Sequence, residues 1–205
     1  MNRVDVAVLP VEALTIDADC YVVVDALRAT TTMAVAFERG LASLVVTGDI
    51  AEARKLGAGS GAVLLGEERG VAPEGFDFGN SPLELEKAQL KGKKGVMVTT
   101  NGTRALCGLA GKGAVAAGAL VNAGAVVEWL RGHDRAVVVC AGNGAGARFG
   151  LEDFMVAGTI VRMAMEATTG IAIGDAARAA MSLAGHWGAA GLRGSEHARY
   201  LVELG

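Results

Sequence analysis

Short apolar runs without polar alternation most constrain the fold of this chain. They occupy residues 21–24, 44–46, 63–65, 96–98 and 136–139. A strand that is apolar on both faces suits a parallel sheet covered on both sides, because a half-exposed strand would alternate. Helix candidates separate the runs, for example 31–39 before Gly40 and 49–56 before Gly57. Strands alternating with helices predict a three-layer α/β/α fold with a largely parallel sheet.

The last third of the chain differs from the rest. From Leu151 onward it is alanine-rich and is predicted to be mostly helical, through Met163 and then from Ala176 to Ala190. We expect these helices to cover one face or edge of the sheet. No Pro- or Ser-rich linker divides the 205 residues, so we predict one α/β domain over 1–205.

Composition and charge exclude several classes of protein. The net charge is -3 and no run of Lys or Arg occurs, which argues against a nucleic-acid partner. No stretch approaches the roughly 18 apolar residues that span a bilayer, and the N-terminus begins as a strand without a signal-peptide core. Three cysteines without short spacing favour neither a disulfide framework nor a zinc site. We therefore expect a cytoplasmic protein with no membrane partner. The sequence does not determine the oligomeric state, and a homo-oligomer is one of the alternatives.

Three polar turns follow apolar runs and lead towards helices, at residues 25–32, 99–104 and 140–144. In parallel α/β sheets such turns gather at the carboxyl ends of the strands, where ligands bind. We expect the first two turns to lie at the same edge of one sheet. Function is therefore predicted at that edge.

The turn at 25–32 combines an acid, an arginine and three hydroxyls. Asp25 closes a buried strand, and Arg28 offers a planar fork to phosphate or sulfonate oxygens. Thr30, Thr31 and Thr32 open a helix, where free N–H groups and the helix dipole favour an anion. The alternative is a helix cap beside a surface Asp–Arg pair.

The turn at 99–104 has the same character. Hydroxyls, an amide and an arginine surround a glycine that lets the backbone approach a ligand. The candidates are Thr99, Thr100, Asn101, Gly102, Thr103 and Arg104. A capped turn without a ligand is the alternative here too.

Further acidic and amide groups come from two other places. The long connection 66–82 carries Glu67, Asp77 and Asn80, which can supply oxygen ligands or position water, or can belong to a solvated loop. Its end, Ser-Pro-Leu-Glu at 81–84, predicts a helix start with a capping box. Glu152 and Asp153 open the long C-terminal helix, where they either stabilise its N-terminus or bind Mg²⁺.

Other catalytic classes find little support. Gly142 to Ala147 fits a dinucleotide fingerprint only weakly, because the helix begins too late. His133, His186 and His197 lie in no metal-ligand spacing, and no Gly-x-Ser-x-Gly elbow occurs, which disfavours Ser–His hydrolysis. Cys140 is expected to be a packed thiol and not a nucleophile.

Taken together and in order, these motifs resemble the 2-phosphosulfolactate phosphatases. The resembling segments are 24–32, 66–67, 75–82, 99–103, 141–142, 152–153 and 157–158. The resemblance runs from Val4 to Arg162. Members of that family continue beyond the segment that resembles 195–205 into a further aspartate-containing stretch. Since this chain stops at Gly205, we expect weaker stability or activity.

The resemblance implies a Mg²⁺-dependent phosphatase. Its substrate would be a small phosphorylated sulfonate and carboxylate, 2-phospho-3-sulfolactate, converted to 3-sulfolactate and phosphate on the way to coenzyme M. The alternatives are a phosphatase of another small phospho-acid or phospho-sugar, and a non-catalytic anion-binding module. Direct attack by water is preferred over a covalent Asp25 intermediate, because the Asp-x-Asp pattern of aspartyl-phosphate phosphatases is absent.

On the matched positions, physical reasoning assigns the roles. The residues expected to be catalytic are Asp25, Arg28, Glu67 and Asp77. Those expected to bind phosphate or substrate are Thr30, Thr31, Thr32, Asn80, Thr99, Thr100, Asn101, Gly102, Thr103 and Arg104, with Arg104 facing the sulfonate or carboxylate. Asp77 is a further candidate for the metal, whose expected ligands are Asp25, Glu67, Glu152 and Asp153.

Overall fold

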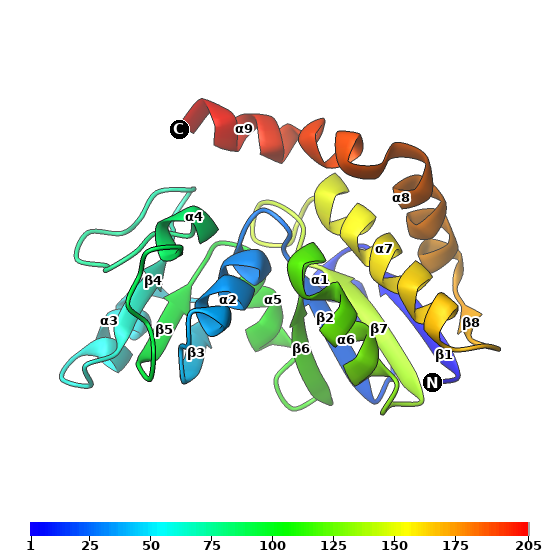
Figure 1. Cartoon of the computed structure of the whole chain (residues 1–205), viewed down its shortest axis with the longest axis horizontal. Helices are drawn as coiled ribbons and strands as arrows, with labels where there is room; N and C mark the ends of the chain where they lie inside the picture. The colour runs from blue at the N-terminus through cyan, green and yellow to red at the C-terminus, as the bar shows by residue number, and fades with distance from the viewer. Residues whose placement is uncertain (205) are drawn as a thin grey trace.

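Strands and helices alternate along the chain and form two parallel sheets flanked by helices (Figure 1). The computed structural model describes residues 1–204. The predicted α/β class is confirmed, and every apolar run named above lies in a strand. The division into two sheets was not predicted. The single domain over 1–205 stays a prediction.

The larger sheet has five strands in the order β6-β2-β7-β1-β8, and all its pairs are parallel. Of its three inner strands, β2 and β7 are almost entirely buried, as expected from their lack of polar alternation. Sequence reasoning missed β6, which is rich in alanine, and β8, which has only two residues. The strands are β1 (Arg3–Ala7), β2 (Cys20–Val24), β6 (Ala114–Gly118), β7 (Arg135–Cys140) and β8 (Ala172–Ile173).

The smaller sheet has three parallel strands in the order β3-β5-β4. Its edge strand β3 alternates between exposed and half-buried positions before it ends in a buried threonine. The strands are β3 (Ser43–Thr47), β4 (Val63–Gly66) and β5 (Lys94–Val98).

Two helices cross between the sheets. Helix α2 (Ala29–Glu38) follows β2 of the larger sheet, but its Met33 and Ala36 pack with Leu65 and Met97 of the smaller sheet. Helix α5 (Gly102–Gly108) follows β5 of the smaller sheet, and its Ala105 belongs to a core on the larger sheet. This exchange brings the carboxyl ends of β2 and β5 together.

The other helices cover the sheets or connect their strands. Helix α6 (Ala123–Leu130) and helix α7 (Leu151–Ala167) share the main core with the larger sheet. Helix α8 (Asp175–Arg193) packs on α7, and α9 (Glu196–Leu204) crosses over the strand ends (Figure 1). The helical last third is therefore confirmed. The remaining short helices are α1 (Pro10–Ala13), α3 (Ile50–Gly57), α4 (Pro82–Leu85) and the 3-10 helix η1 (Leu120–Asn122).

The predicted capping box at the start of α4 is wrong. The helix has only four residues, and the Ser81 side chain makes no capping hydrogen bond. Glu84 instead accepts a hydrogen bond from the backbone N–H of Gly79 at 2.8 Å. Its carboxylate thus closes the preceding loop. Across residues 1–204, no helix is both long and apolar enough to cross a bilayer.

Candidate active site

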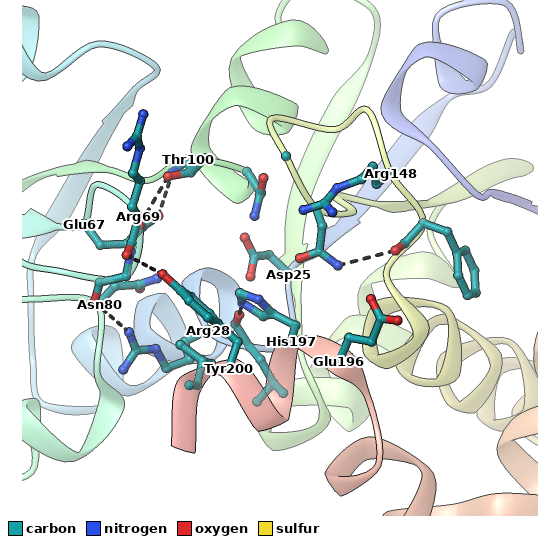
Figure 2. Close-up of a pocket in the computed structure, with 17 residues that line it drawn as sticks. Asp25, Arg28, Glu67, Arg69, Asn80, Thr100, Arg148, Glu196, His197 and Tyr200 are labelled. Carbon is teal, nitrogen blue, oxygen red and sulfur yellow. Dashed lines mark hydrogen bonds between the residues drawn. The ribbon is translucent and has the colours of Figure 1, made fainter. Parts of the chain in front are cut away.

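A cavity of about 420 Å³ opens where the carboxyl ends of both sheets meet (Figure 2). Its walls come from the β2–α2 turn, the loop after β4, the β5–α5 turn, the β7–α7 loop and helix α9. The predicted convergence of the turns at 25–32 and 99–104 is confirmed, although they belong to different sheets. Six residues predicted for the site line this cavity: Asp25, Arg28, Glu67, Asn80, Thr100 and Asn101.

Asp25 lies at the base of the cavity and is only 6% exposed. Its Oδ1 accepts a hydrogen bond from the N–H of Ala29 at 3.1 Å. A Cβ at Gly102 would lie 2.7 Å from Oδ2, so only glycine lets α5 come this close. Burial raises the pKa of Asp25 to about 6, and the nearby Glu67 acts in the same direction, while hydrogen bonds and His197 oppose the shift.

Arg28 and Asn80 each carry a buried polar atom that has no hydrogen-bond partner within residues 1–204. The atoms are Nε of Arg28, a donor, and Oδ1 of Asn80, an acceptor. Arg28 also donates through Nη2 to the carbonyl oxygen of Gly70 at 3.3 Å, which holds its side chain at the wall. Since buried polar groups are almost always paired, this donor and acceptor fit a ligand or ordered solvent.

Glu67 joins two loops of the smaller sheet. Its Oε1 accepts the N–H of Thr100 at 2.7 Å, and its Oε2 accepts the N–H of Gly70 at 2.7 Å. The Thr100 hydroxyl donates to Oε2 at 3.2 Å. Thr100 thus lines the cavity through its link to Glu67, and the carboxylate is held in place by three donors.

Asp153 plays a similar part for the larger sheet, but outside the cavity lining. Its Oδ1 accepts the N–H of Ala26 at 2.8 Å, and its Oδ2 accepts the N–H of Gly142 at 2.9 Å. Burial and the charge of Asp25 raise its pKa. Glu152 is buried as well, and it does not line the cavity either. The structure therefore brings only Asp25 and Glu67 of the four expected metal ligands to the cavity.

The predicted hydroxyl donors of the β2–α2 turn are used within the protein. Thr30 Oγ1 donates to the carbonyl oxygen of Asp25 at 2.8 Å and accepts its N–H at 3.1 Å. Thr31 donates to the Ala26 carbonyl at 2.9 Å, and Thr32 to the Asn80 carbonyl at 3.1 Å. None of the three threonines lines the cavity. They shape the turn around Asp25.

The same holds for most of the β5–α5 turn. Thr99 and Thr103 exchange hydrogen bonds, with Thr103 Oγ1 accepting the Thr99 N–H at 2.8 Å and Thr99 Oγ1 accepting the Thr103 N–H at 3.1 Å. Arg104 packs beside Gly48 on the smaller sheet. Thr99, Gly102, Thr103 and Arg104 do not line the cavity.

Asp77, expected to be catalytic, lies on the surface outside the cavity lining. Its Oδ2 accepts the backbone N–H of Leu64 at 2.8 Å, and its own N–H donates to the Leu64 carbonyl at 3.0 Å. The residue thus fastens the loop to strand β4.

Several cavity residues were not found from the sequence. Helix α9 contributes His197, whose Nε2 lies 2.7 Å from the Leu27 carbonyl oxygen, and Tyr200, whose hydroxyl donates to the Arg69 carbonyl at 2.9 Å. The β7–α7 loop contributes Arg148. No spacing pointed to these residues, because they lie far from the turns in the sequence and only the fold brings them to the cavity.

The donor set fits a small hard cation. Across residues 1–204, no group of three or more His, Cys, Asp or Glu side chains is arranged to hold a metal ion by itself. Mg²⁺ needs only one or two carboxylates, because waters and substrate phosphate complete its octahedron. Asp25 and Glu67 offer two carboxylates, and Oδ1 of Asn80 is a buried oxygen without a donor.

A parallel α/β fold with arginines and buried carboxylates at its strand ends is typical of enzymes that act on small anions. The chain belongs to the 2-phosphosulfolactate phosphatase family, a family of phosphoric monoester hydrolases: the family model described as 2-phosphosulpholactate phosphatase matches residues 9–205. Three similar proteins are each named probable 2-phosphosulfolactate phosphatase. The relative from Thermotoga petrophila is 38% identical over 177 residues, 86% of this chain and 74% of the relative.

The other two relatives are similar over shorter stretches. The Thermotoga maritima protein is 38% identical over 159 residues, 78% of this chain and 67% of the relative. The Pseudothermotoga lettingae protein is 41% identical over 140 residues, 68% of this chain and 60% of the relative. The third alignment thus spans less than two thirds of the relative's length.

Proposed function

We propose that this protein hydrolyses the phosphate monoester of 2-phospho-3-sulfolactate in a Mg²⁺-dependent reaction. Water enters, the bond between phosphorus and the ester oxygen breaks, and 3-sulfolactate and inorganic phosphate leave. Family membership and the names of the relatives support the reaction and the substrate.

One structural observation carries the proposal. The unpaired buried donor of Arg28 and the carboxylate of Asp25 come from one turn, while Glu67 and Thr100 come from the other sheet, and all four residues line one cavity. Guanidinium donors suit the equatorial oxygens of a phosphoryl group, whose charge spreads over these oxygens in the transition state. The carboxylates of Asp25 and Glu67 would repel the phosphate unless a cation stood between them and the phosphoryl oxygens.

Asp25, Glu67 and Asn80 would hold that cation. Mg²⁺ supplies charge neutralisation at the phosphoryl oxygens when bound. Arg28 holds the phosphoryl group from the β2–α2 turn, and its bond to the Gly70 carbonyl keeps it in place. The three donors on Glu67 fix the position of its carboxylate. A site ordered before the substrate arrives needs little rearrangement during the reaction.

Direct attack by water is the proposed route. The proton released by the attacking water leaves with phosphate or solvent, and a proton from solvent completes the hydroxyl of 3-sulfolactate. The cytoplasm is the proposed location, and production of 3-sulfolactate towards coenzyme M is the proposed metabolic role. Both rest on the substrate and on the resemblance described above.

The test is phosphate release by an Arg28→Ala variant. We expect turnover of 2-phospho-3-sulfolactate to fall about 100- to 1,000-fold, the usual loss when one electrostatic donor to the transition state is removed. The midpoint of thermal unfolding should stay within a few degrees of the wild type. Arg162→Ala is the matched control, because Arg162 forms an exposed ion pair with Glu166 on α7. Unchanged turnover in Arg28→Ala would remove Arg28 from the mechanism.

Chelation tests the metal separately. EDTA should stop phosphate release, and added Mg²⁺ should restore it. Full activity in the chelator would contradict the metal requirement and leave hydrolysis itself standing. A panel of phosphorylated hydroxy acids and sugars separates the alternatives: a different preferred substrate would favour another phosphatase, and binding without release would favour an anion-binding module.

A further inference from the structure

We propose that Arg148 binds the second oxyanion of the substrate, the sulfonate or carboxylate that is not transferred, and thereby determines specificity. This inference rests on the proposed function. Arg104, expected from the sequence to do this, does not line the cavity, whereas Arg148 does.

The direction of the Arg148 side chain is the first support. In Figure 2 it reaches from the β7–α7 loop towards Asp25, on the side opposite Arg28. In the same view the Arg69 side chain runs along the rim past Thr100 and not towards Asp25. A substrate whose phosphate lies between Arg28 and Asp25 would therefore extend its other charged groups towards Arg148.

The guanidinium of Arg148 is uncommitted. The ion pairs found within residues 1–204 join Arg3 to Asp5, Arg131 to Glu128 and Arg162 to Glu166. The Arg148 side chain makes no hydrogen bond in this part of the chain. A free planar fork at a cavity wall suits a carboxylate or sulfonate, which accepts two parallel N–H bonds.

The backbone beneath Arg148 is fixed by hydrogen bonds. Asn143 and Arg148 exchange two backbone bonds, of 2.8 and 3.0 Å. The Asn143 amide donates to the Phe149 carbonyl at 3.3 Å. These bonds close residues 143–149 into a compact turn and limit the conformations open to the Arg148 side chain.

That turn is tied to both turns that carry the phosphate site. The N–H of Ala145 donates to Oδ1 of Asn101 at 2.9 Å, on the β5–α5 turn. The N–H of Gly142 donates to Asp153, whose other oxygen accepts the N–H of Ala26, next to Asp25. The separation between Arg148 and Asp25 is therefore set by the fold, which is what selection by substrate length requires.

The charge of the cavity agrees with this assignment. Its lining carries three carboxylates, on Asp25, Glu67 and Glu196, and three guanidinium groups, on Arg28, Arg69 and Arg148. The acidic Asp25 and Glu67 lie together near the proposed cation. A sulfonate or carboxylate would be repelled there, so the free arginine away from Glu67 is the more favourable partner.

The experiment measures phosphate release from three substrates by wild type and Arg148→Met. The substrates are 2-phospho-3-sulfolactate, 2-phospholactate, which lacks the sulfonate, and the phosphate ester of 2-hydroxyethanesulfonate, which lacks the carboxylate. On the full substrate we expect kcat/KM to fall about 10- to 100-fold, mainly through KM, as for the loss of a hydrogen bond to a charged group. Arg148→Lys should recover part of the loss.

The truncated substrates identify the group. The substrate that lacks the oxyanion bound by Arg148 should be hydrolysed nearly equally by wild type and Arg148→Met. If wild type and Arg148→Met hydrolyse 2-phospholactate equally, Arg148 binds the sulfonate. If they hydrolyse the ester of 2-hydroxyethanesulfonate equally, Arg148 binds the carboxylate. Arg131→Met, on the surface after α6, is the matched control and should behave as wild type.

The same data separate failure of this inference from failure of the proposed function. An equal loss by Arg148→Met on all three substrates, or no loss on any, would overturn the role of Arg148 while wild-type turnover upheld the phosphatase. No release by the wild type from any of the three would contradict the proposed function, and the role of Arg148 would fall with it.

Discussion

The two sheets contribute to the cavity in different ways. The larger sheet presents Asp25 at the end of a fully buried strand, and burial raises the pKa of this carboxyl to about 6. The smaller sheet presents Glu67, whose oxygens accept three hydrogen bonds from Gly70 and Thr100. Both acids are buried, but three hydrogen bonds hold the carboxylate of Glu67, whereas burial is the main influence on the ionisation of Asp25.

A turn from a strand into a helix can both stabilise the start of the helix and supply side chains to the cavity. The β2–α2 and β5–α5 turns each run from an apolar strand into a helix with threonine in its first turn. In each, most hydroxyls form hydrogen bonds within the turn, while Asp25 and Arg28 reach the cavity from the first turn and Thr100 and Asn101 from the second. Because α2 and α5 cross to the opposite sheet, neither sheet can form the site alone. The proposed phosphatase therefore depends on the contact between the sheets.

The largest expected effect concerns the burial of Asp25, which should make the free energy of unfolding of the protein depend on pH. The unfolded carboxyl ionises near its ordinary pKa of 3.8 and the folded one near about 6, so ionisation opposes folding. The destabilisation is absent well below pH 4, grows as the pH rises through both pKa values, and is complete only well above pH 6. Two pKa units correspond to about 3 kcal/mol.

Asp25→Asn tests this directly. The free energy of unfolding of the variant minus that of the wild type should rise by about 2 kcal/mol between pH 4 and 7, measured by urea unfolding with EDTA present. Asp17→Asn, at an exposed position, is the control and should give a nearly constant difference. A pH-independent difference for Asp25→Asn would break the contrast between the two acids.

The second expected effect concerns two glycines, Gly66 at the end of β4 in the smaller sheet and Gly158 on α7, which covers the larger sheet. A Cβ at Gly66 would overlap the carbonyl oxygen of Val98, and a Cβ at Gly158 would overlap that of Ala180. Each change to alanine should lower the free energy of unfolding by about 2 kcal/mol, as overpacking does. Gly66→Ala should also lower phosphate release, because Glu67 follows directly, whereas Gly158→Ala should leave turnover of the folded fraction close to wild type.

Thermal unfolding and initial rates on folded protein measure both effects. Gly158 lies where α7 packs on α8, remote from the cavity lining. Equal losses of turnover in the two variants would show that the position beside Glu67 has no special effect on the reaction.

The smallest expected effect tests whether Asp77, in the long connection 66–82, is structural or catalytic. Asp77→Ala removes the acceptor of the Leu64 N–H and should lower the free energy of unfolding by about 1 kcal/mol. Turnover should fall far less than in Arg28→Ala, since Asp77 does not line the cavity. A loss of activity as large as that of Arg28→Ala, with stability unchanged, would restore the catalytic role expected from the sequence.

The sequence predicted the strands well because burial on both faces leaves a direct pattern, as in Val22 to Val24. It also located Asp25, Arg28, Glu67 and Thr100, since turns after parallel strands gather at one edge. It did not predict the two sheets, because an apolar run does not indicate which strand lies beside it.

The site was predicted less completely than the fold, for two physical reasons. Threonines that cap a helix and threonines that bind an anion have the same sequence pattern, so Thr30 and Thr103 could not be told apart from ligands. His197 and Arg148 reach the cavity only through the folding of α9 and the β7–α7 loop. Their local sequences carry no sign of that position.

The central claim is that acids from the two sheets act as one unit, and a double-mutant cycle tests it most directly. Phosphate release from 2-phospho-3-sulfolactate would be measured for Asp25→Asn, Glu67→Gln and the double variant, with folding checked for each. If both carboxylates serve one reaction centre, each single change lowers kcat by about 100-fold or more. The kcat of the double variant is then close to that of the less active single variant. Losses that multiply in the double variant, or full turnover in either single variant, would contradict a shared site.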